Sequence, residues 1–146
     1  MTAFVVDASV VIKWVVQEEG SDAAVRLIEG PTLSAPDLLI PECANILWKK
    51  VRREELTREE AKLAAELLIR ADIELVPTRA LMSAALRLAV DLGHAAYDCM
   101  YLALAMERGD TFVTADAKFA RLVARVGGSE LGGKVVELGA VGTWDA

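Results

Sequence analysis

The chain has 146 residues, of which 54% are hydrophobic, and its mean hydropathy is +0.35. This length suits one domain spanning residues 1–146, and the composition excludes an intrinsically disordered chain. The formal net charge of −6 argues against a protein that grips nucleic acid by bulk positive charge. A nuclease remains possible, because cations bound by a cluster of acids reverse the local field.

Two cysteines, Cys43 and Cys99, are too few for a disulfide framework or a four-thiolate zinc site. Both lie in apolar, helix-like segments, so we expect buried free thiols in a reducing compartment. The first residues run directly into a strand-like segment with no basic region or cleavage pattern, and charges interrupt the apolar runs well short of a membrane span. The sequence therefore favours a cytoplasmic protein that does not enter a membrane.

Strand-like and helix-like segments alternate from the start of the chain. An apolar, β-branched segment at residues 3–6 predicts a strand, and a helix is expected from about residue 9 to residue 17. Ser21 is expected to cap the next helix, which would carry Val25 and Ile28 on one face.

A weak strand at residues 32–35 is followed by a helical stretch over residues 36–53. Within this stretch, Pro41 marks either a kink or the first turn of a second helix. Thr57 and Glu60 have the spacing of a capping box, so another helix should begin there.

The rest of the chain continues the alternation. The expected segments are a strand at 73–76, a helix ended by Gly93, an apolar helix at 94–108 ended by Gly109, a strand at 111–114, a helix at 117–126, a glycine-rich loop at 127–133 and a strand at 135–138. This order predicts an α/β domain of three layers, with helices on both faces of a central parallel sheet.

Four of the 22 acidic residues stand apart, because each is the lone charge in an apolar segment. They are Asp7, Glu42, Asp98 and Asp116. An unpaired buried carboxylate is costly, so such acids are protonated, paired or bound to metal. None has Lys or Arg beside it in sequence, and a shared divalent cation would satisfy all four.

The positions of these acids predict that they converge. Asp7 and Asp116 follow predicted strands, and Glu42 and Asp98 lie near predicted helix starts that point to the same edge. In open parallel sheets, sites form beyond the carboxyl ends of the strands.

Small polar residues accompany the acids. Ser9 follows Asp7 by two residues, Asn45 lies one helical turn after Glu42, and Thr114 precedes Asp116 by two residues. Hydroxyls and amides at such spacings can orient carboxylates that bind a metal.

Each acid also has a structural interpretation. A lone Asp after a strand is often a helix cap, which fits Asp7 or Asp116, and Glu42 fits an exposed helix position. Asp98 is hardest to explain in this way, because its helix is apolar nearly all round, and we expect its side chain to be largely buried except towards a bound metal. The four acids taken together favour a site.

Four sequence blocks carry a resemblance to a known family. They are Val5-Val6-Asp7-Ala8-Ser9-Val10, Pro36-Asp37-Leu38-Leu39 followed by Glu42 and Asn45, Tyr97-Asp98 running into Tyr101-Leu102-Ala103-Leu104-Ala105, and Thr114-Ala115-Asp116. In order and spacing, over almost the whole chain, these blocks resemble the PIN-domain toxins of VapBC toxin–antitoxin modules.

The resemblance implies a three-layer α/β/α PIN-like domain that cleaves RNA with Mg²⁺ or Mn²⁺. The residues that it assigns to metal binding and catalysis are Asp7, Glu42, Asp98 and Asp116, with Ser9 and Thr114 as polar support. It also implies a cognate antitoxin protein that occludes the site, and a homodimer. Pro41 departs from the family pattern, since a helix-forming residue is more usual directly before the Glu42 position.

Other interpretations stay open. A PIN-like domain can serve as a non-catalytic binding module, and a metal-dependent phosphatase would use similar acids. The segment 128–135 nearly spells a phosphate-binding P-loop, but Val135 stands where Ser or Thr should reach Mg²⁺. His94 is more typical of a helix cap or a surface position than of a base. A run of cations fits either a solvated helix end or an RNA contact, and it consists of Lys49, Lys50, Arg52 and Arg53.

Overall fold

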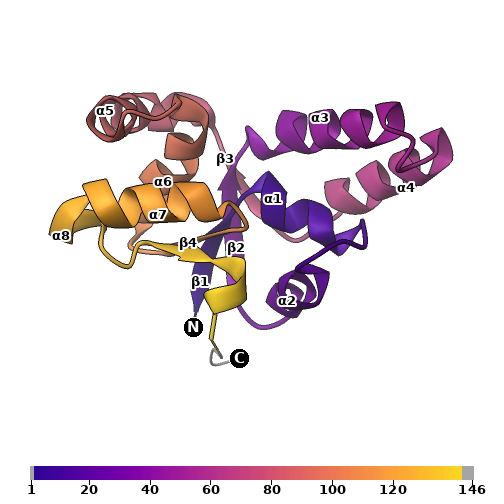
Figure 1. The fold of residues 1–146 in the computed structure, drawn as a ribbon, viewed down its shortest axis with the longest axis horizontal. Coiled ribbons are helices and arrows are strands. Elements are labelled where there is room, and N and C mark those ends of the chain that lie inside the picture. Colours follow the sequence, from indigo (N-terminus) through magenta and orange to yellow (C-terminus); the bar gives the residue numbers. More distant parts are fainter. Residues whose placement is uncertain (1, 143–146) are drawn as a thin grey trace.

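A computed structural model describes residues 2–142 of the chain (Figure 1). Its centre is a five-stranded sheet with the strand order β3-β2-β1-β4-β5, in which every neighbouring pair is parallel. The strands are β1 (Ala3–Val6), β2 (Thr32–Pro36), β3 (Glu74–Val76), β4 (Thr111–Thr114) and β5 (Val135–Glu137). The predicted parallel sheet is therefore confirmed.

Helices cover both faces of this sheet. The α-helices are α1 (Ala8–Val11), α2 (Ser21–Val25), α3 (Leu39–Arg52), α4 (Arg58–Ile69), α5 (Met82–Leu92), α6 (Ala96–Arg108), α7 (Ala117–Val126) and α8 (Gly128–Leu131). Short 3₁₀ turns add Ile12–Trp14, Arg26–Ile28, Thr78–Leu81 and Leu138–Ala140. Figure 1 shows α1 to α4 on one side of the sheet and α5 to α8 on the other.

This division follows from the handedness of the connections. The chain moves outward from β1 to β3, and right-handed crossovers put the connecting helices on one face. It then returns to β4 and continues to β5, so the same handedness puts the later helices on the opposite face. The predicted three-layer α/β/α arrangement is thus confirmed.

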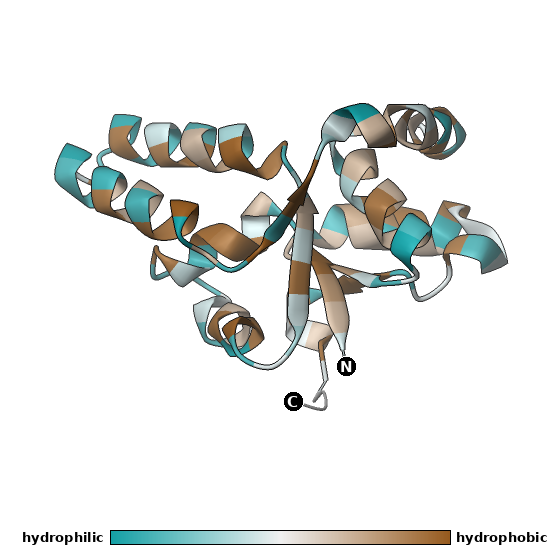
Figure 2. Cartoon of the chain, turned by 180° about the vertical axis from the view of Figure 1, so that it is seen from behind, coloured by the Kyte–Doolittle hydropathy of each residue, from teal (hydrophilic) through white to brown (hydrophobic). Residues whose placement is uncertain are grey.

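The core lies on both faces of the central strands. Val5 and Val6 of β1 are fully buried, as expected for a parallel strand covered on both sides. The helix α6 supplies a continuous buried run from Tyr101 to Ala105 and packs on β1, β2 and β4. Figure 2 shows the outer helices alternating between hydrophobic and hydrophilic residues, as amphipathic helices at a surface do.

The sheet register aligns the two strand ends that matter for the site. Val6 of β1 pairs with Val113 of β4, so the next residues, Asp7 and Thr114, are level at the carboxyl edge. In Figure 1 this edge is at the top of the sheet, between α3 on one side and α6 and α7 on the other.

The beginning of the chain differs from its prediction. The expected helix over residues 9–17 is a four-residue α1 followed by a 3₁₀ turn that ends at Trp14, whose indole N–H donates to the carbonyl oxygen of Ala24 at 2.7 Å. Ser21 does not cap α2. Its hydroxyl accepts from the amide of Glu18 and donates to the carbonyl of Val16, which braces the loop instead.

The predicted face that carries Val25 and Ile28 is not the buried one. Val25 and Ile28 are about half exposed, whereas Ala24 and Leu27 are fully buried. The buried face lies one residue earlier, and the helix that begins at Ser21 changes to a 3₁₀ turn at Arg26.

The structure tests three predictions about the later chain. Pro36 closes β2 rather than opening a helix, and Pro41 lies in the first turn of α3, where its missing N–H costs no helical hydrogen bond. The capping box of Thr57 and Glu60 is confirmed. The glycine-rich segment contains the short α8, which buries Leu131, so it is only partly a loop.

None of the helices within residues 2–142 has both the length and the apolar character needed to cross a membrane.

Gly93 provides a test of the α5–α6 connection. Its φ of +66° is left-handed, and a Cβ built on it would meet nothing within 4 Å. Gly93→Ala should therefore lower the free energy of unfolding by about 1 kcal/mol through backbone conformation alone, and Gly93→Asn by less, because Asn tolerates this region. Urea denaturation of the three proteins checks this ranking, and equal stability of the Ala and Gly proteins would contradict it.

Candidate active site

Each of the four predicted acids lies at the N-terminal end of a helix. Asp7 is the N-cap of α1 and Asp116 is the N-cap of α7, while Glu42 and Asp98 lie in the first turns of α3 and α6. The N-terminal end of a helix carries partial positive charge, which favours a carboxylate. All four helices begin at the carboxyl edge of the sheet, as the sequence predicted.

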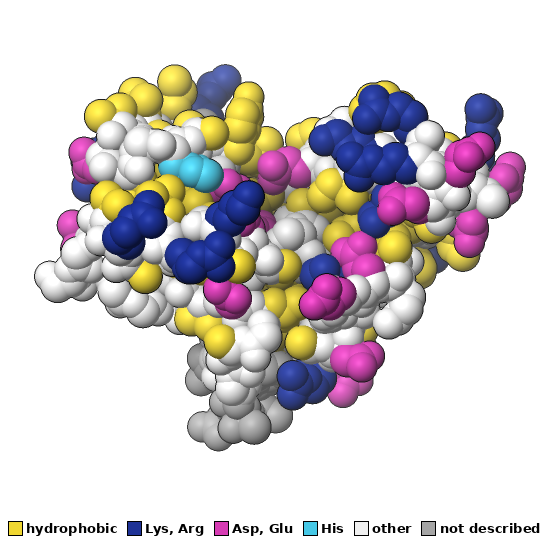
Figure 3. Space-filling view, in the orientation of Figure 1, with side chains coloured by type: hydrophobic (Ala, Val, Ile, Leu, Met, Phe, Trp, Pro, Cys, Tyr) yellow, Lys and Arg dark blue, Asp and Glu magenta, His cyan; other side chains and the backbone are white. Residues whose placement is uncertain are grey.

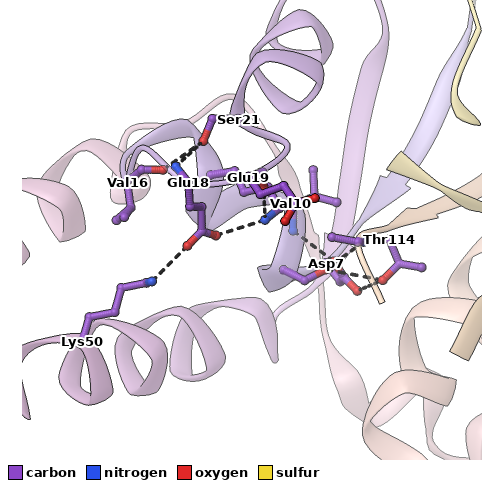
Figure 4. A network of polar contacts seen from close by, with 11 residues as sticks. Asp7, Val10, Val16, Glu18, Glu19, Ser21, Lys50 and Thr114 are labelled. Atoms are coloured by element: carbon purple, nitrogen blue, oxygen red, sulfur yellow. Dashed lines mark hydrogen bonds and ion pairs between the residues drawn. The ribbon is translucent and has the colours of Figure 1, made fainter. Parts of the chain in front are cut away.

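Asp7 is the most constrained of the four. Its side chain is buried, Ser9 Oγ donates to its Oδ1 at 2.5 Å, and Thr114 Oγ1 donates to its Oδ2 at 2.6 Å. The amide of Val10 also donates to Oδ1, at 3.2 Å. Figure 4 shows Asp7 and Thr114 pointing toward one another from β1 and β4.

The two hydroxyls are themselves held by the loop after β4. Ser9 Oγ accepts from the amide of Ala115 at 3.0 Å, and Thr114 Oγ1 accepts from the amide of Asp116 at 3.0 Å. Each hydroxyl has one proton, and both protons are donated to Asp7. The predicted polar support by Ser9 and Thr114 is therefore present as a fixed network.

Burial changes the ionisation of Asp7. Desolvation raises its pKa from 3.8 to about 6, although the hydrogen bonds from Ser9, Thr114 and Val10 oppose this shift. The negative charge of Asp98 raises the pKa further. Ionisation of Asp7 is thus less favourable in the folded protein than in the unfolded chain, and a nearby positive charge would favour it.

Glu42 is held by a residue that the sequence did not assign to the site. Tyr101 Oη, from the buried middle of α6, donates to Glu42 Oε1 at 2.5 Å. Burial raises the pKa of Glu42, the Tyr101 hydrogen bond lowers it, and Asp98 raises it. The only signal for Tyr101 in the sequence was its spacing of three residues from Asp98, which puts both on neighbouring turns of α6.

Asp98 lies in the first turn of α6, at the open edge of the sheet, where its side chain is 33% exposed. Asp98 Oδ2 lies 2.7 Å from His94 Nε2, and the His94 ring lies 4.9 Å from the ring of Phe119. His94 is therefore not a helix cap but a partner of Asp98, at an i, i+4 spacing that the sequence displays.

Asp116 combines two roles. Its Oδ1 accepts from the amides of Lys118 and Phe119, which makes it a helix cap, as the structural interpretation expected. Its own amide donates to Thr114 Oγ1, which joins it to the network around Asp7.

The two cysteines do not supply ligands. Burial raises the pKa of Cys43 to about 12 and that of Cys99 to about 11, so both thiols stay protonated near neutral pH. They are buried free thiols, as predicted. The donor set at this edge is therefore made of oxygen atoms.

The oxygen donors at this edge suit a hard divalent cation, because they lie close together and lack a Lys or Arg partner. Asp98 raises the pKa of both Asp7 and Glu42, so the three carboxylates lie within electrostatic reach of one another. Within residues 2–142, none of the ion pairs gives Asp7, Glu42 or Asp116 a Lys or Arg partner. Mg²⁺ and Mn²⁺ prefer such oxygen ligands.

The acids do not form a closed ligand shell by themselves. Among residues 2–142, no three His, Cys, Asp or Glu side chains are already arranged to hold a metal ion. The half-exposed acids Glu42 and Asp98 would have to turn toward Asp7 to share a cation with it.

A second ion network fixes α3 beside the site. Glu18 Oε1 pairs with Lys13 Nζ at 3.1 Å, and Glu18 Oε2 pairs with Lys50 Nζ at 2.9 Å (Figure 4). These hydrogen-bonded pairs lower the pKa of Glu18 against the opposing effect of burial. Lys50 thus has a structural role, which separates it from the other cations of the run that ends α3.

Comparisons with known proteins agree with this architecture. The PIN domain family matches residues 4–124. Ribonuclease VapC3 of Pyrobaculum aerophilum is 34% identical over 119 residues, which cover 80% of this chain and 91% of that protein.

Solved structures of low sequence identity share the fold. PAE2754 from Pyrobaculum aerophilum has a TM-score of 0.67 at 22% identity, over 94% of this chain and 85% of that one. VapBC2 from Rickettsia felis, bound to a DNA fragment from its promoter, has a TM-score of 0.65 at 12% identity, over 93% and 98%. Mycobacterium tuberculosis VapC20, a sarcin–ricin loop cleaving toxin, has a TM-score of 0.62 at 16% identity, over 81% and 93%.

Because the family match spans most of the chain and the VapC3 relative is similar over nearly its whole length, this chain belongs to the PIN-domain family, as a VapC-type member.

Proposed function

We propose that this chain is an endoribonuclease that hydrolyses RNA phosphodiester bonds with Mg²⁺ or Mn²⁺, and that it is the toxin of a toxin–antitoxin pair. The observation that carries the proposal is Asp7, a buried acid that receives hydrogen bonds at both carboxylate oxygens and lies within reach of the Asp98 charge. This arrangement costs stability, which supports a functional reason for it. The VapC3 relative, a ribonuclease by name, supports RNA as the substrate.

The residues of this chain would act as holders of a charged centre. The cation would be bound by the four acids Asp7, Glu42, Asp98 and Asp116. A divalent cation supplies activation of water for in-line attack and stabilisation of the negative charge on the phosphate.

Hydrogen bonds would fix the orientation of Asp7 before the substrate arrives, while Glu42 and Asp98 would turn toward it as the cation binds. Ser9 and Thr114 hold both oxygens of Asp7, and Tyr101 holds one oxygen of Glu42. Preorganised ligands do not have to reorient as charge develops on the phosphate, which lowers the barrier. His94 would stay hydrogen-bonded to one oxygen of Asp98 and limit the orientations open to that side chain.

The proposal includes two protein partners. A cognate antitoxin would cover the acidic edge, in keeping with the VapBC2 pair among the structural neighbours. A second copy of the chain would cover apolar surface, because large hydrophobic side chains are exposed, among them Met82, Leu86 and Val90 along one face of α5.

Replacing a single acid tests the reaction. Asp7→Asn and Asp98→Asn keep the shape of the side chains and remove their charge, so RNA cleavage in Mn²⁺ should fall by on the order of a hundredfold or more. Asp91→Asn, at an exposed position of α5, is the matched control and should cleave like the wild type. Time courses with structured and unstructured RNAs measure the rates.

Three outcomes would overturn the proposal. Wild-type rates in both site variants would exclude these acids from catalysis. Binding of Mn²⁺ without any RNA cleavage would indicate a binding module. Hydrolysis of a simple phosphate ester, with none of RNA, would indicate a phosphatase.

The effect of metal on stability should depend on pH. Burial, with an addition from Asp98, raises the pKa of Asp7 from 3.8 to about 6, so without metal the protein loses stability as pH rises from about 4 through 6 and Asp7 ionises. At pH 7.5 a cation relieves this repulsion, whereas at pH 5 it must first displace a proton. Millimolar Mn²⁺ should therefore raise the Tm more at pH 7.5 than at pH 5.

Thermal denaturation in Mn²⁺ and in chelator measures this difference. The double variant Asp7→Asn/Asp98→Asn should show little shift at either pH, and it serves as the control for non-specific effects of the cation. An equal shift in the wild type and the double variant would count against the site.

The apolar surface leads to a prediction about assembly. Light scattering at micromolar concentration should give a mass of at least two chains, since burying the exposed hydrophobic side chains favours association. A monomer mass of 15.7 kDa across the concentration range would contradict the proposed homodimer.

A further inference from the structure

Two groups of cations flank the acidic edge, and the catalytic proposal uses neither. The first is on α7, which begins at Asp116. The segment 117–129 carries three positive charges and no acid, although the whole chain has a net charge of −6. These cations are Lys118, Arg121 and Arg125.

Helical spacing puts these three side chains on one face. Residues three and four positions apart are neighbours on a helix, and all three side chains are exposed. The opposite face buries Phe119, Ala120 and Val123 against the rest of the domain. The outer surface of α7 therefore carries basic side chains from its first turn to its last, and no acidic one.

The second group lies at the end of α3. Lys49 and Arg53 are seven and eleven residues after Glu42, so they follow the same face of the helix at successive turns. Both are exposed. The face that begins with a site acid thus ends with two cations.

The neighbouring cations of α3 are already engaged. Lys50 pairs with Glu18, and the Arg52 guanidinium lies 4.6 Å from the centre of the Trp48 ring. By contrast, none of the ion pairs within residues 2–142 includes Lys49, Arg53 or the three cations of α7.

The space-filling view shows how the groups lie. Lys and Arg side chains gather over α7 on the left of Figure 3 and over the end of α3 at the upper right. The surface between them is hollowed, and acidic side chains lie in the hollow. A polyanion that places one phosphate at the acids can therefore place its next phosphates on cations in both directions.

We infer that the RNA strand crosses the acidic edge with its backbone bound on both sides of the cut, by Lys118, Arg121 and Arg125 of α7 and by Lys49 and Arg53 of α3. This inference rests on the proposed ribonuclease function and assigns the residues that bind its substrate. The basic faces attract phosphates whatever the base sequence, so they contribute affinity and orientation rather than sequence recognition.

The inference predicts a defect in binding rather than in chemistry. Neutralising the α7 face should raise KM by about tenfold at 50 mM salt and leave kcat unchanged, because lost phosphate contacts are made equally in the ground state and the transition state. It should also make the dependence of log(kcat/KM) on log salt shallower by about two, at roughly 0.7 per contact on a single strand.

Three variants make the comparison. The α7 variant is Lys118→Gln/Arg121→Gln/Arg125→Gln, and the α3 variant is Lys49→Gln/Arg53→Gln. The control removes as much charge as the α7 variant from exposed cations on other elements, namely Arg26→Gln/Lys62→Gln/Arg70→Gln. Because the α7 and control variants have the same net charge, any difference in their KM or salt dependence arises from where the removed cations lie.

The outcomes decide the inference. Raised KM and a shallower salt dependence in the α7 and α3 variants, with wild-type values in the control, support it. Values equal to those of the control overturn it, and would leave the basic faces to an acidic protein partner. Lowered kcat at unchanged KM also overturns it, since the substitutions would then act on the site itself.

A binding arm separates this inference from the proposed function. Fluorescence anisotropy measures labelled RNA on Asp98→Asn, with and without the α7 substitutions, in Mg²⁺ at several salt concentrations. If the wild type cleaves no RNA, the proposed function fails, yet weaker RNA binding on loss of the α7 cations still supports the inferred phosphate contacts. Equal binding with and without those cations overturns the inference, whether or not the wild type cleaves.

Discussion

The hydrogen bonds around Asp7 are the constraint on which the site depends. They join the ends of β1 and β4, since Ser9 and Thr114 both donate to the carboxylate and are held in turn by the amides of Ala115 and Asp116. The parallel pairing of Val6 with Val113 makes this closure possible, because it brings Asp7 and Thr114 level. A shift of one residue in the register would turn these side chains to opposite faces of the sheet and remove the network.

The fold concentrates negative charge where burial makes it unfavourable. Desolvation opposes ionisation of Asp7 and Glu42, and Asp98 adds repulsion to both. The hydrogen bonds and helix N-termini offset part of this cost without supplying a full positive charge. A site balanced in this way leaves its carboxylates without a full positive charge, which a bound divalent cation would supply under the proposed function.

The fold was largely predictable from the sequence, because alternation, capping residues and glycines at helix ends are local signals. The positions of the four acids followed from the rule that parallel strands end at one edge. The failures have tertiary causes. Tyr101 donates to Glu42 although the two residues are 59 positions apart in sequence. No periodicity in the sequence predicts such a contact. The partial exposure of Asp98 follows from its place in the first turn of α6, at the open edge, whereas the apolar sequence of α6 reflects its later turns.

Net charge describes this molecule poorly. The value of −6 excluded a protein that is basic overall. The cations of α7 near the site nevertheless lie together, in a segment without neighbouring acids. Glu18 pairs with Lys13 and Lys50 beside α3, whereas none of the ion pairs within residues 2–142 includes the cations on the outer face of α7. At physiological ionic strength charges act over about 8 Å, so the field that an RNA strand meets is set by the nearest groups and not by the sum over the chain. A protein with a net negative charge can in this way have basic surfaces beside an acidic site. Acids far from those surfaces would weaken RNA binding only slightly.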